Sequence, residues 1–400
     1  MDEKLIIFVI AFIILVYGFF SKKLETYNIS GPMVFLIIGI FLSPLGLGVS
    51  TIDIDSNIIK TIAEIALVIV LFTDSSSINL KVFKKEWSIA ARLLFIGLPL
   101  TIVFSSFSAT LFFPNEPLIN LLLMALILAP TDAALGKAVV SDTNVPERIR
   151  DNINVESGLN DGIVFPLLIT VILLMAGKQE LGANYAWFPY LLEQILLGFI
   201  FGALSGFIGA KSLGFAIKKR WVEDTYKNLS PVALAILSFY IAEYLGGNGF
   251  IAAFISGLFF GNFSNVIDSE RKDFLESEGE ILILMSFLIF GIAYIPVTIE
   301  FWNLNVFIYS LLSLTLFRMI PVAISLIGLK LSLFSNLFIG WFGPRGIASI
   351  LYVMIVAQKV DVIAGHETLF GVISLTILLS IILHGLSASP LASLYKNRKL

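Results

Sequence analysis

Runs of about 20 apolar residues follow one another along almost the whole chain, and they constrain its fold more than any other feature. A helix of about this length crosses the hydrocarbon core of a bilayer. Thirteen such runs are separated mostly by a few polar residues, and they lie at about 5–20, 30–48, 57–74, 88–112, 117–136, 151–176, 188–215, 229–246, 248–263, 279–298, 303–328, 333–357 and 366–394. The pattern predicts an all-α polytopic membrane protein with about 13 transmembrane helices, packed as a single domain over residues 1–400.

The composition agrees with a membrane protein and excludes several other classes. Of the 400 residues, 58% are hydrophobic and 14% are charged, whereas soluble domains have about a quarter charged residues. A soluble fold this apolar would leave large apolar patches in water. The 26 basic and 29 acidic residues give no positive surplus for nucleic acid, and the absence of cysteine excludes disulfides and thiolate sites. We therefore expect a partner in membrane lipid, no resident cofactor, and a protein that is not an enzyme.

Basic residues gather in every second loop, and this alternation predicts the orientation of the chain. Lys and Arg favour the cytoplasmic side of short loops. They lie at 22–23, 81–85, 148–150, 218–227, 271–272, 330 and 396–399. We expect the protein to lie in the plasma membrane. With thirteen spans, the alternation places its N-terminus outside the cell and its C-terminus in the cytoplasm. Asp2 and Glu3 precede the first run, so we expect a retained helix and not a signal peptide.

A small set of charged residues lies within the predicted spans. A charge at the bilayer centre costs at least about 2.5–3.5 kcal/mol, and it usually faces the bundle interior and marks a transport pathway. The set comprises Glu64, Asp74, Asp132, Glu156, Asp161, Glu243, Arg318 and Arg345. These residues are the candidates for a working site.

The span at 151–176 carries the most informative group of polar residues. Glu156 and Asn160 are four apart, as are Ser157 and Asp161, so all four share one helical face. The face offers two carboxylates, a carboxamide and a hydroxyl, which are hard oxygen ligands. The alternative is the solvated first turn of a helix, but Asp161 lies too far beyond Arg150 for that.

Two spans are interrupted by proline next to a charge. Pro130 precedes Thr131 and Asp132, and Gly343-Pro344-Arg345-Gly346 interrupts a later span. Proline frees backbone carbonyls such as that of Ala129, which must then find partners inside a membrane. Interrupted helices in corresponding positions of two halves point to a transporter site, and the helix ends favour Asp132 and Arg345 as compensating charges. Charge matching also pairs Arg318 with Glu156, which leaves Asp161 as the unpaired carboxylate.

These motifs, in this order, resemble the NhaP-type sodium/proton antiporters of the monovalent cation:proton antiporter-1 family. The matching stretches are Ala129–Asp132, Glu156–Gly162, Arg318 and Gly343–Gly346. The resemblance implies an inverted-repeat fold with two crossed unwound helices, at 117–136 and 333–357. It implies a core part at about 88–176 and 303–394, and a dimerisation part at about 1–74 and 188–298, in a homodimer.

The resemblance also implies the roles of the site residues. Asp161 would carry both the cation and the proton, as the Na⁺ site. Asn160 would support it, and Thr131 and Ser157 would supply ligand oxygens. Family members often place an acidic residue near the end of the third span, where Asp74 is the best match.

One carboxylate that holds either a cation or a proton gives exchange, provided that the empty, charged site cannot cross the membrane. Because the neighbour of Asp161 is an asparagine and not a second aspartate, the sequence predicts one cation for one proton, and hence electroneutral transport by alternating access. Na⁺ is the first-choice cation, with K⁺ or Li⁺ left open. The alternatives are a cation-coupled organic anion symporter of similar architecture, a channel, and an intramembrane hydrolase built on Asp132 and Asp161.

Overall fold

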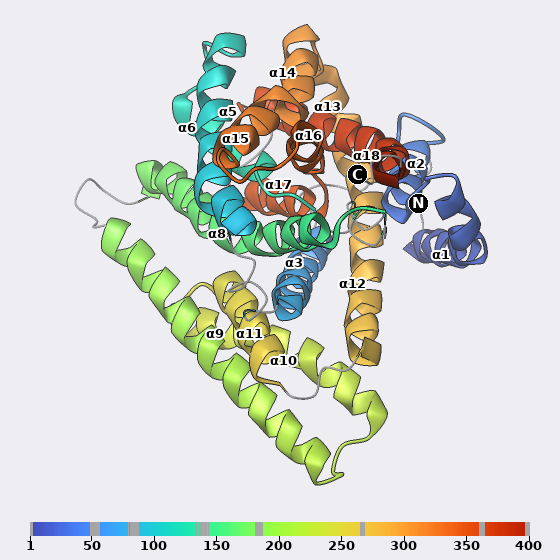
Figure 1. Cartoon of the computed structure of the whole chain (residues 1–400), viewed down its shortest axis with the longest axis vertical. Helices are drawn as coiled ribbons and strands as arrows, with labels where there is room; N and C mark the ends of the chain where they lie inside the picture. Colours follow the sequence, from blue (N-terminus) through green and yellow to red (C-terminus); the bar gives the residue numbers. More distant parts are fainter. Residues whose placement is uncertain are drawn as a thin grey trace.

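The computed structural model describes residues 3–48, 57–78, 80, 88–132, 135, 139, 142, 144–180, 187–264, 269–359 and 365–396. Within these ranges every regular element is a helix (Figure 1). The first half comprises α1 (Glu3–Thr26), α2 (Gly31–Leu42), α3 (Asn57–Ser77), the π-helical turn η1 (Leu93–Gly97), α5 (Leu98–Phe112), α6 (Leu118–Leu128) and α8 (Glu147–Glu180). The all-α fold class is therefore confirmed.

The second half of the chain is also helical in its described ranges. It comprises α9 (Trp187–Lys218), α10 (Asp224–Tyr244), α11 (Gly249–Phe263), α12 (Ser269–Ile289), the π-helical turn η2 (Phe290–Tyr294), α13 (Ile295–Thr298), the 3-10 turn η3 (Ile299–Phe301), α14 (Leu304–Leu314), α15 (Leu316–Ser325), α16 (Leu333–Trp341), α17 (Ile347–Lys359) and α18 (Glu367–Lys396). In Figure 1, α9, α10 and α11 lie together at the bottom of the view, and α5, α6 and α14 lie at the top.

Many of the helices suit a bilayer. Six described helical segments, among them Ser88–Phe112 and Glu367–Tyr395, are long and apolar enough to cross a membrane, and four shorter helices are also apolar. Exposed large apolar side chains such as Leu111 and Phe207 agree with a lipid-facing surface, since a soluble protein would hide many of them. The total of thirteen spans stays a prediction.

Helices stop at both proline motifs. α6 ends at Leu128 and residues 129–132 are not helical, and α16 ends at Trp341, five non-helical residues before α17 begins at Ile347. The cause is local, because proline lacks the N–H that a helix interior requires and clashes with the preceding turn. A further interruption at Thr315, between α14 and α15, has no proline and was not predicted.

Glycines allow α9, α11 and α3 to pack backbone against backbone. Gly198, Gly202 and Gly206 of α9 face the backbone of α11, where any added Cβ would overlap main-chain atoms. On α11, Gly257 and Gly261 face Phe72 and Ser76 of α3 in the same way. Small residues four apart are the usual means of close helix packing in membranes. The three helices thus form one tightly packed layer.

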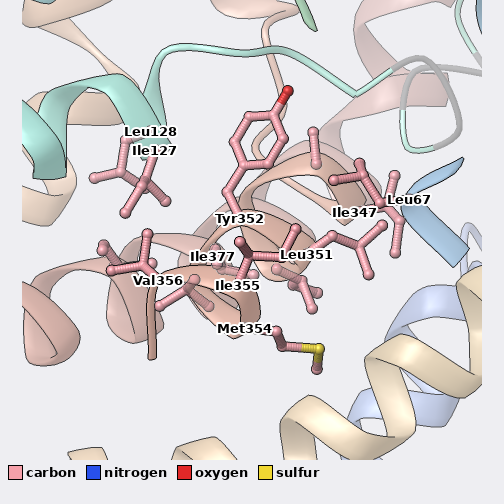
Figure 2. Packing of buried hydrophobic residues seen from close by; sticks show 14 of the residues in the cluster. Leu67, Ile127, Leu128, Ile347, Leu351, Tyr352, Met354, Ile355, Val356 and Ile377 are labelled. Atoms are coloured by element: carbon pink, nitrogen blue, oxygen red, sulfur yellow. The ribbon is translucent and has the colours of Figure 1, made fainter. Parts of the chain in front are cut away.

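One part of the apolar core lies between α3, α6, α17 and α18. Figure 2 shows Leu351, Ile355 and Val356 of α17 among Leu128 of α6, Leu67 of α3 and their neighbours. This core holds the first turns of α17 beside the end of α6, and it thereby brings the two helix breaks to one place.

Candidate ion-binding site

The polar face of α8 lies deep inside the protein. α8 begins at Glu147, so Asp161 lies about four turns into the helix and the solvated-start interpretation is wrong. Glu156, Ser157, Asn160 and Asp161 are each no more than 5% exposed. Two carboxylates, an amide and a hydroxyl are therefore gathered on one buried helical surface.

Asp161 carries no ion pair among the described residues. Its carboxylate accepts a hydrogen bond from the hydroxyl of Tyr352, with 3.3 Å between Oδ1 and Oη. The other acidic groups whose charges act on it are those of Asp74 and Asp132. A buried carboxylate with a neutral donor and two acidic neighbours is poorly stabilised as a bare charge, and a proton or a cation relieves that.

Thr131, Ser157 and Asn160 form a hydrogen-bonded group beside Asp161. Thr131 Oγ1 lies 3.0 Å from Ser157 Oγ, and Asn160 donates from Nδ2 to Thr131 Oγ1 at 2.7 Å. The remaining side-chain acceptor, Asn160 Oδ1, is buried and has no hydrogen-bond partner in the described structure. Orphaned buried acceptors are unusual, and this one is open to a cation.

Glu156 is neutralised by a buried arginine. Arg318 of α15 places Nη2 at 3.0 and 3.1 Å from the two carboxylate oxygens, and both side chains are almost fully buried. Gly343 makes room for this pair, because a Cβ there would overlap the guanidinium group of Arg318. The carboxylate of Glu156 thus has an ion-pair partner, and that of Asp161 has none among the described residues.

The break after α6 supplies a cap to α17. Asp132 accepts from the backbone N–H of Ile347 at 2.8 Å, and its own N–H donates to the carbonyl of Pro344 at 2.8 Å. An aspartate at a helix N-terminus satisfies an otherwise unpaired N–H and complements the helix dipole. Gly346 is required here, since a Cβ would overlap the Asp132 carboxylate.

The break before α17, in turn, supplies a hydrogen-bond donor to the C-terminal end of α6. Arg345, which is 1% exposed, donates from Nη1 to the carbonyls of Leu128 and Ala129, where α6 ends. A cation at a helix C-terminus is favourable for the same electrostatic reason. The Ala129 carbonyl, predicted as a cation ligand, therefore already has a protein partner, and only its second lone pair remains.

Asp74 lies on α3, the helix that faces the polar side of α8. The two helices are close at Gly158, whose Cβ position lies 3.3 Å from the side chain of Ile78 and 3.8 Å from the backbone oxygen of Asp74. Asp74 is partly buried, and its charge acts on both Asp161 and Tyr352. Glu64 is on the same helix, almost three turns earlier.

The motifs omitted Tyr352, Ser380 and His384. Ser380 of α18 accepts from the backbone N–H of Arg345 at 2.6 Å, and His384 Nε2 lies 3.0 Å from the Trp341 carbonyl oxygen. Both residues, from α18, thus contact the backbone of the interruption between α16 and α17. One signal was available: Tyr352 follows Arg345 by seven residues, about two turns, so its side chain points back along α17 toward the break.

Known proteins show similarity over most of this chain. Residues 8–394 match the family model described as "Sodium/hydrogen exchanger, transmembrane". The K(+)/H(+) antiporter NhaP of Alkalimonas amylolytica is 27% identical over 365 residues, which cover 90% of this chain and 61% of that protein. A Na(+)/H(+) antiporter of Schizosaccharomyces pombe is 26% identical over 326 residues, covering 72% of this chain and 69% of the relative.

The fold has a solved counterpart. The sodium proton antiporter MjNhaP1 from Methanocaldococcus jannaschii superposes with a TM-score of 0.79 at 22% identity, over 98% of this chain and 99% of that one. At this identity the likeness shows the fold alone. This chain spans only about three fifths of the K(+)/H(+) relative's length, yet the family model covers nearly all of this chain. The chain therefore belongs to the transmembrane sodium/hydrogen exchanger family.

Proposed function

We propose that this protein exchanges Na⁺ for protons, one for one, at Asp161. The observation that carries the proposal is the contrast on α8, where Glu156 has a buried arginine partner and Asp161 has only a neutral hydroxyl. A paired carboxylate is already neutralised. An unpaired buried carboxylate binds a positive ion, and the proton and Na⁺ are the two that compete for it.

The oxygens around Asp161 suit a dehydrated monovalent cation. Ser157 and Thr131 supply hydroxyl lone pairs, and Asn160 Oδ1 supplies an amide oxygen without a protein partner in the described structure. Asp74, across the α3–α8 contact, is the candidate second carboxylate. Together these groups replace the water that a cation loses on entry, as hard oxygen ligands do.

Exchange follows from single occupancy. The empty site holds a bare buried carboxylate, whose transfer through the apolar interior is costly, so the site crosses only when loaded. A proton or a monovalent cation each adds one charge, and both loaded forms are neutral at Asp161. Asn160 adds no titrating group beside it, and transport is therefore electroneutral.

Alternating access requires one part of the molecule to move against another. We assign residues 88–176 and 303–394 to the moving core, and residues 1–74 and 188–298 to a static part that forms a homodimer. The tight glycine packing of α9, α11 and α3 supports a rigid static part. The protein is placed in the plasma membrane with its N-terminus outside and its C-terminus in the cytoplasm, as the loop charges indicate.

K⁺ is the second candidate cation, because a relative that matches 90% of this chain is named a K(+)/H(+) antiporter. The organic anion symporter is less well supported. Such a carrier needs a cationic anchor for its substrate, and here Arg318 pairs with Glu156 while Arg345 binds the end of α6.

Purified protein in liposomes that hold a pH-sensitive dye tests the proposal. Na⁺, K⁺ and Li⁺ are added in separate arms, and Na⁺ is expected to collapse an imposed proton gradient in the wild type. Asp161→Asn is the negative control, and Glu300→Gln, at an exposed position on η3, is the matched control that retains activity. Exchange by Asp161→Asn, or none by the wild type with any cation, overturns the proposal.

A further inference from the structure

Tyr352 is a fully buried polar residue directly beside the ion-binding carboxylate. It lies on α17 five residues after Ile347, whose N–H is capped by Asp132. Figure 2 shows its hydroxyl oxygen directed away from the apolar side chains of Leu351, Ile355 and their neighbours. That oxygen lies 3.3 Å from Asp161 Oδ1, the one side-chain hydrogen bond described for this carboxylate.

The ring of Tyr352 is held separately from its hydroxyl. Phe165 packs against it with ring centroids 5.5 Å apart, and Phe165 follows Asp161 by four residues on the same face of α8. Phe250 of α11 also packs against Phe165, with ring centroids 5.0 Å apart. α8 therefore contacts Tyr352 twice, through a ring and through a carboxylate. Loss of the hydroxyl alone leaves the ring contact in place.

We propose that the Tyr352 hydroxyl belongs to the ion-binding site and sets how protons and cations share Asp161. This inference rests on the proposed exchange at Asp161. A hydroxyl has one donor and two acceptor lone pairs, so it can serve each state of the carboxylate in turn. It donates to the charged form, with or without a cation, and it accepts from the protonated form once its own hydrogen turns away.

The donated hydrogen bond favours the charged carboxylate, which is the form that binds a cation. When the hydroxyl is removed, the charged form loses more than the neutral protonated form does, because hydrogen bonds to charged groups are the stronger ones. Protons then compete better against cations at every pH. The apparent affinity for the cation falls, and the pH of half-maximal exchange rises. The rate at saturating cation and high pH stays near that of the wild type.

Tyr352→Phe tests this assignment against Tyr309→Phe. Tyr309 is equally buried, but its hydroxyl donates to the backbone oxygen of Ser105 at 3.0 Å and not to Asp161. Exchange rates are measured in liposomes across pH and cation concentration. Tyr352→Phe is expected to raise the cation concentration for half-maximal rate by about tenfold and to move the pH profile about one unit to the alkaline side. Tyr309→Phe is expected to move neither.

The outcomes separate this inference from the proposed function. Absence of exchange in the wild type defeats the proposed function itself. Exchange in the wild type with an unchanged profile in Tyr352→Phe overturns the assignment of Tyr352 alone. So does an equal shift in Tyr309→Phe, which would mean a general effect of losing a buried hydroxyl.

A second pair of measurements covers a variant that does not fold or transport. Phe165→Leu loosens the ring and leaves the hydroxyl, and a smaller shift in the same direction is expected. Infrared difference spectra of the purified protein report the carboxylic acid band that Asp161→Asn removes. That band is expected to change frequency in Tyr352→Phe, and an unchanged band contradicts the hydrogen bond.

Discussion

Two acidic side chains on α8, five residues apart, lie in opposite electrostatic surroundings. Glu156 meets the guanidinium group of Arg318 at 3.0 Å, and Asp161 meets a tyrosine hydroxyl. The environment thus separates a carboxylate that has an ion-pair partner from one that has only a neutral hydrogen-bond donor. The same residue class serves structure in one case and, we propose, transport in the other.

Removal of Arg318 is predicted to destabilise the protein more than removal of the pair. Arg318→Ala leaves the Glu156 carboxylate buried without its partner, which costs about 3–5 kcal/mol. Thermal unfolding in detergent measures this as a large drop in melting temperature. The double variant Glu156→Gln with Arg318→Gln is expected to recover much of the loss, because no buried charge remains. Equal losses in the single and double variants would contradict this explanation.

At the residue scale, charged groups were easy to find from the sequence and Tyr352 was not. Charges are rare in apolar spans, so each of Asp132, Glu156, Asp161, Arg318 and Arg345 attracts attention by its cost in lipid. Tyrosine carries no such cost, and among the 11 tyrosines in the chain only the spacing of seven residues from Arg345 marks this one. Only the folded structure places its hydroxyl beside Asp161. The functional roles of all these residues stay predictions.

At the scale of the elements, the two helix breaks complete each other. Asp132 from the first caps α17, and Arg345 from the second binds the carbonyls at the end of α6. Ser349 adds a third link by donating to the carbonyl of Ile127 at 2.7 Å. The polar backbone exposed by each proline is thus satisfied by the other break, as a membrane interior requires.

Gly346→Ala is predicted to disrupt this arrangement. Its Cβ would overlap the Asp132 carboxylate, and the forced shift is expected to cost about 1–3 kcal/mol in stability and most of the exchange activity. Gly279→Ala on α12 is the matched control, because nothing lies within 4 Å of its Cβ position. Melting temperature and liposome exchange measure both effects. A Gly346→Ala protein as stable and active as Gly279→Ala would refute the prediction.

Proline predicts the interruptions at Pro130 and Pro344, because it removes a backbone donor from a helix interior. Proline alone is not decisive, since α8, α10, α15 and α18 each continue through one. The π-helical turns η1 and η2 also come directly before prolines, since Pro99 and Pro296 open the helices that follow them. Proline clashes with the carbonyl four residues earlier, and that carbonyl lies inside each π-helical turn. The irregular Thr315, in contrast, has no proline beside it.

For the whole molecule, competition at one carboxylate makes a quantitative prediction about pH. In the pH range where protons occupy Asp161 in place of the cation, each fall of one pH unit should raise the cation concentration for half-maximal exchange tenfold. The maximal rate should stay unchanged. Initial rates over a grid of pH and cation concentration measure this. A maximal rate that falls with acid while the half-saturating concentration stays fixed would point to a separate regulatory proton.

If exchange is electroneutral, as we propose, the exchange rate does not depend on membrane voltage. Liposomes clamped at zero and at about 100 mV should exchange at equal rates, because neither loaded form carries net charge at Asp161. A moved elementary charge would be worth about 2.3 kcal/mol at 100 mV, which is far above the error of a rate measurement. Asn160→Asp is the informative companion, because a second carboxylate adds a second proton and should make the exchange voltage-dependent.

The mutual capping of the two breaks also bears on the order in which the chain is synthesised and folds. Arg345 and its acceptor at Leu128 are 217 residues apart in the chain. At about 5–20 residues per second, a ribosome makes the end of α6 about 10–40 s before it makes the arginine. Throughout that interval the nascent α6 lacks its permanent electrostatic partner. The proposed ion site is therefore completed only after Arg345 is made, and a chain stopped short of Arg345 would leave the end of α6 without this partner.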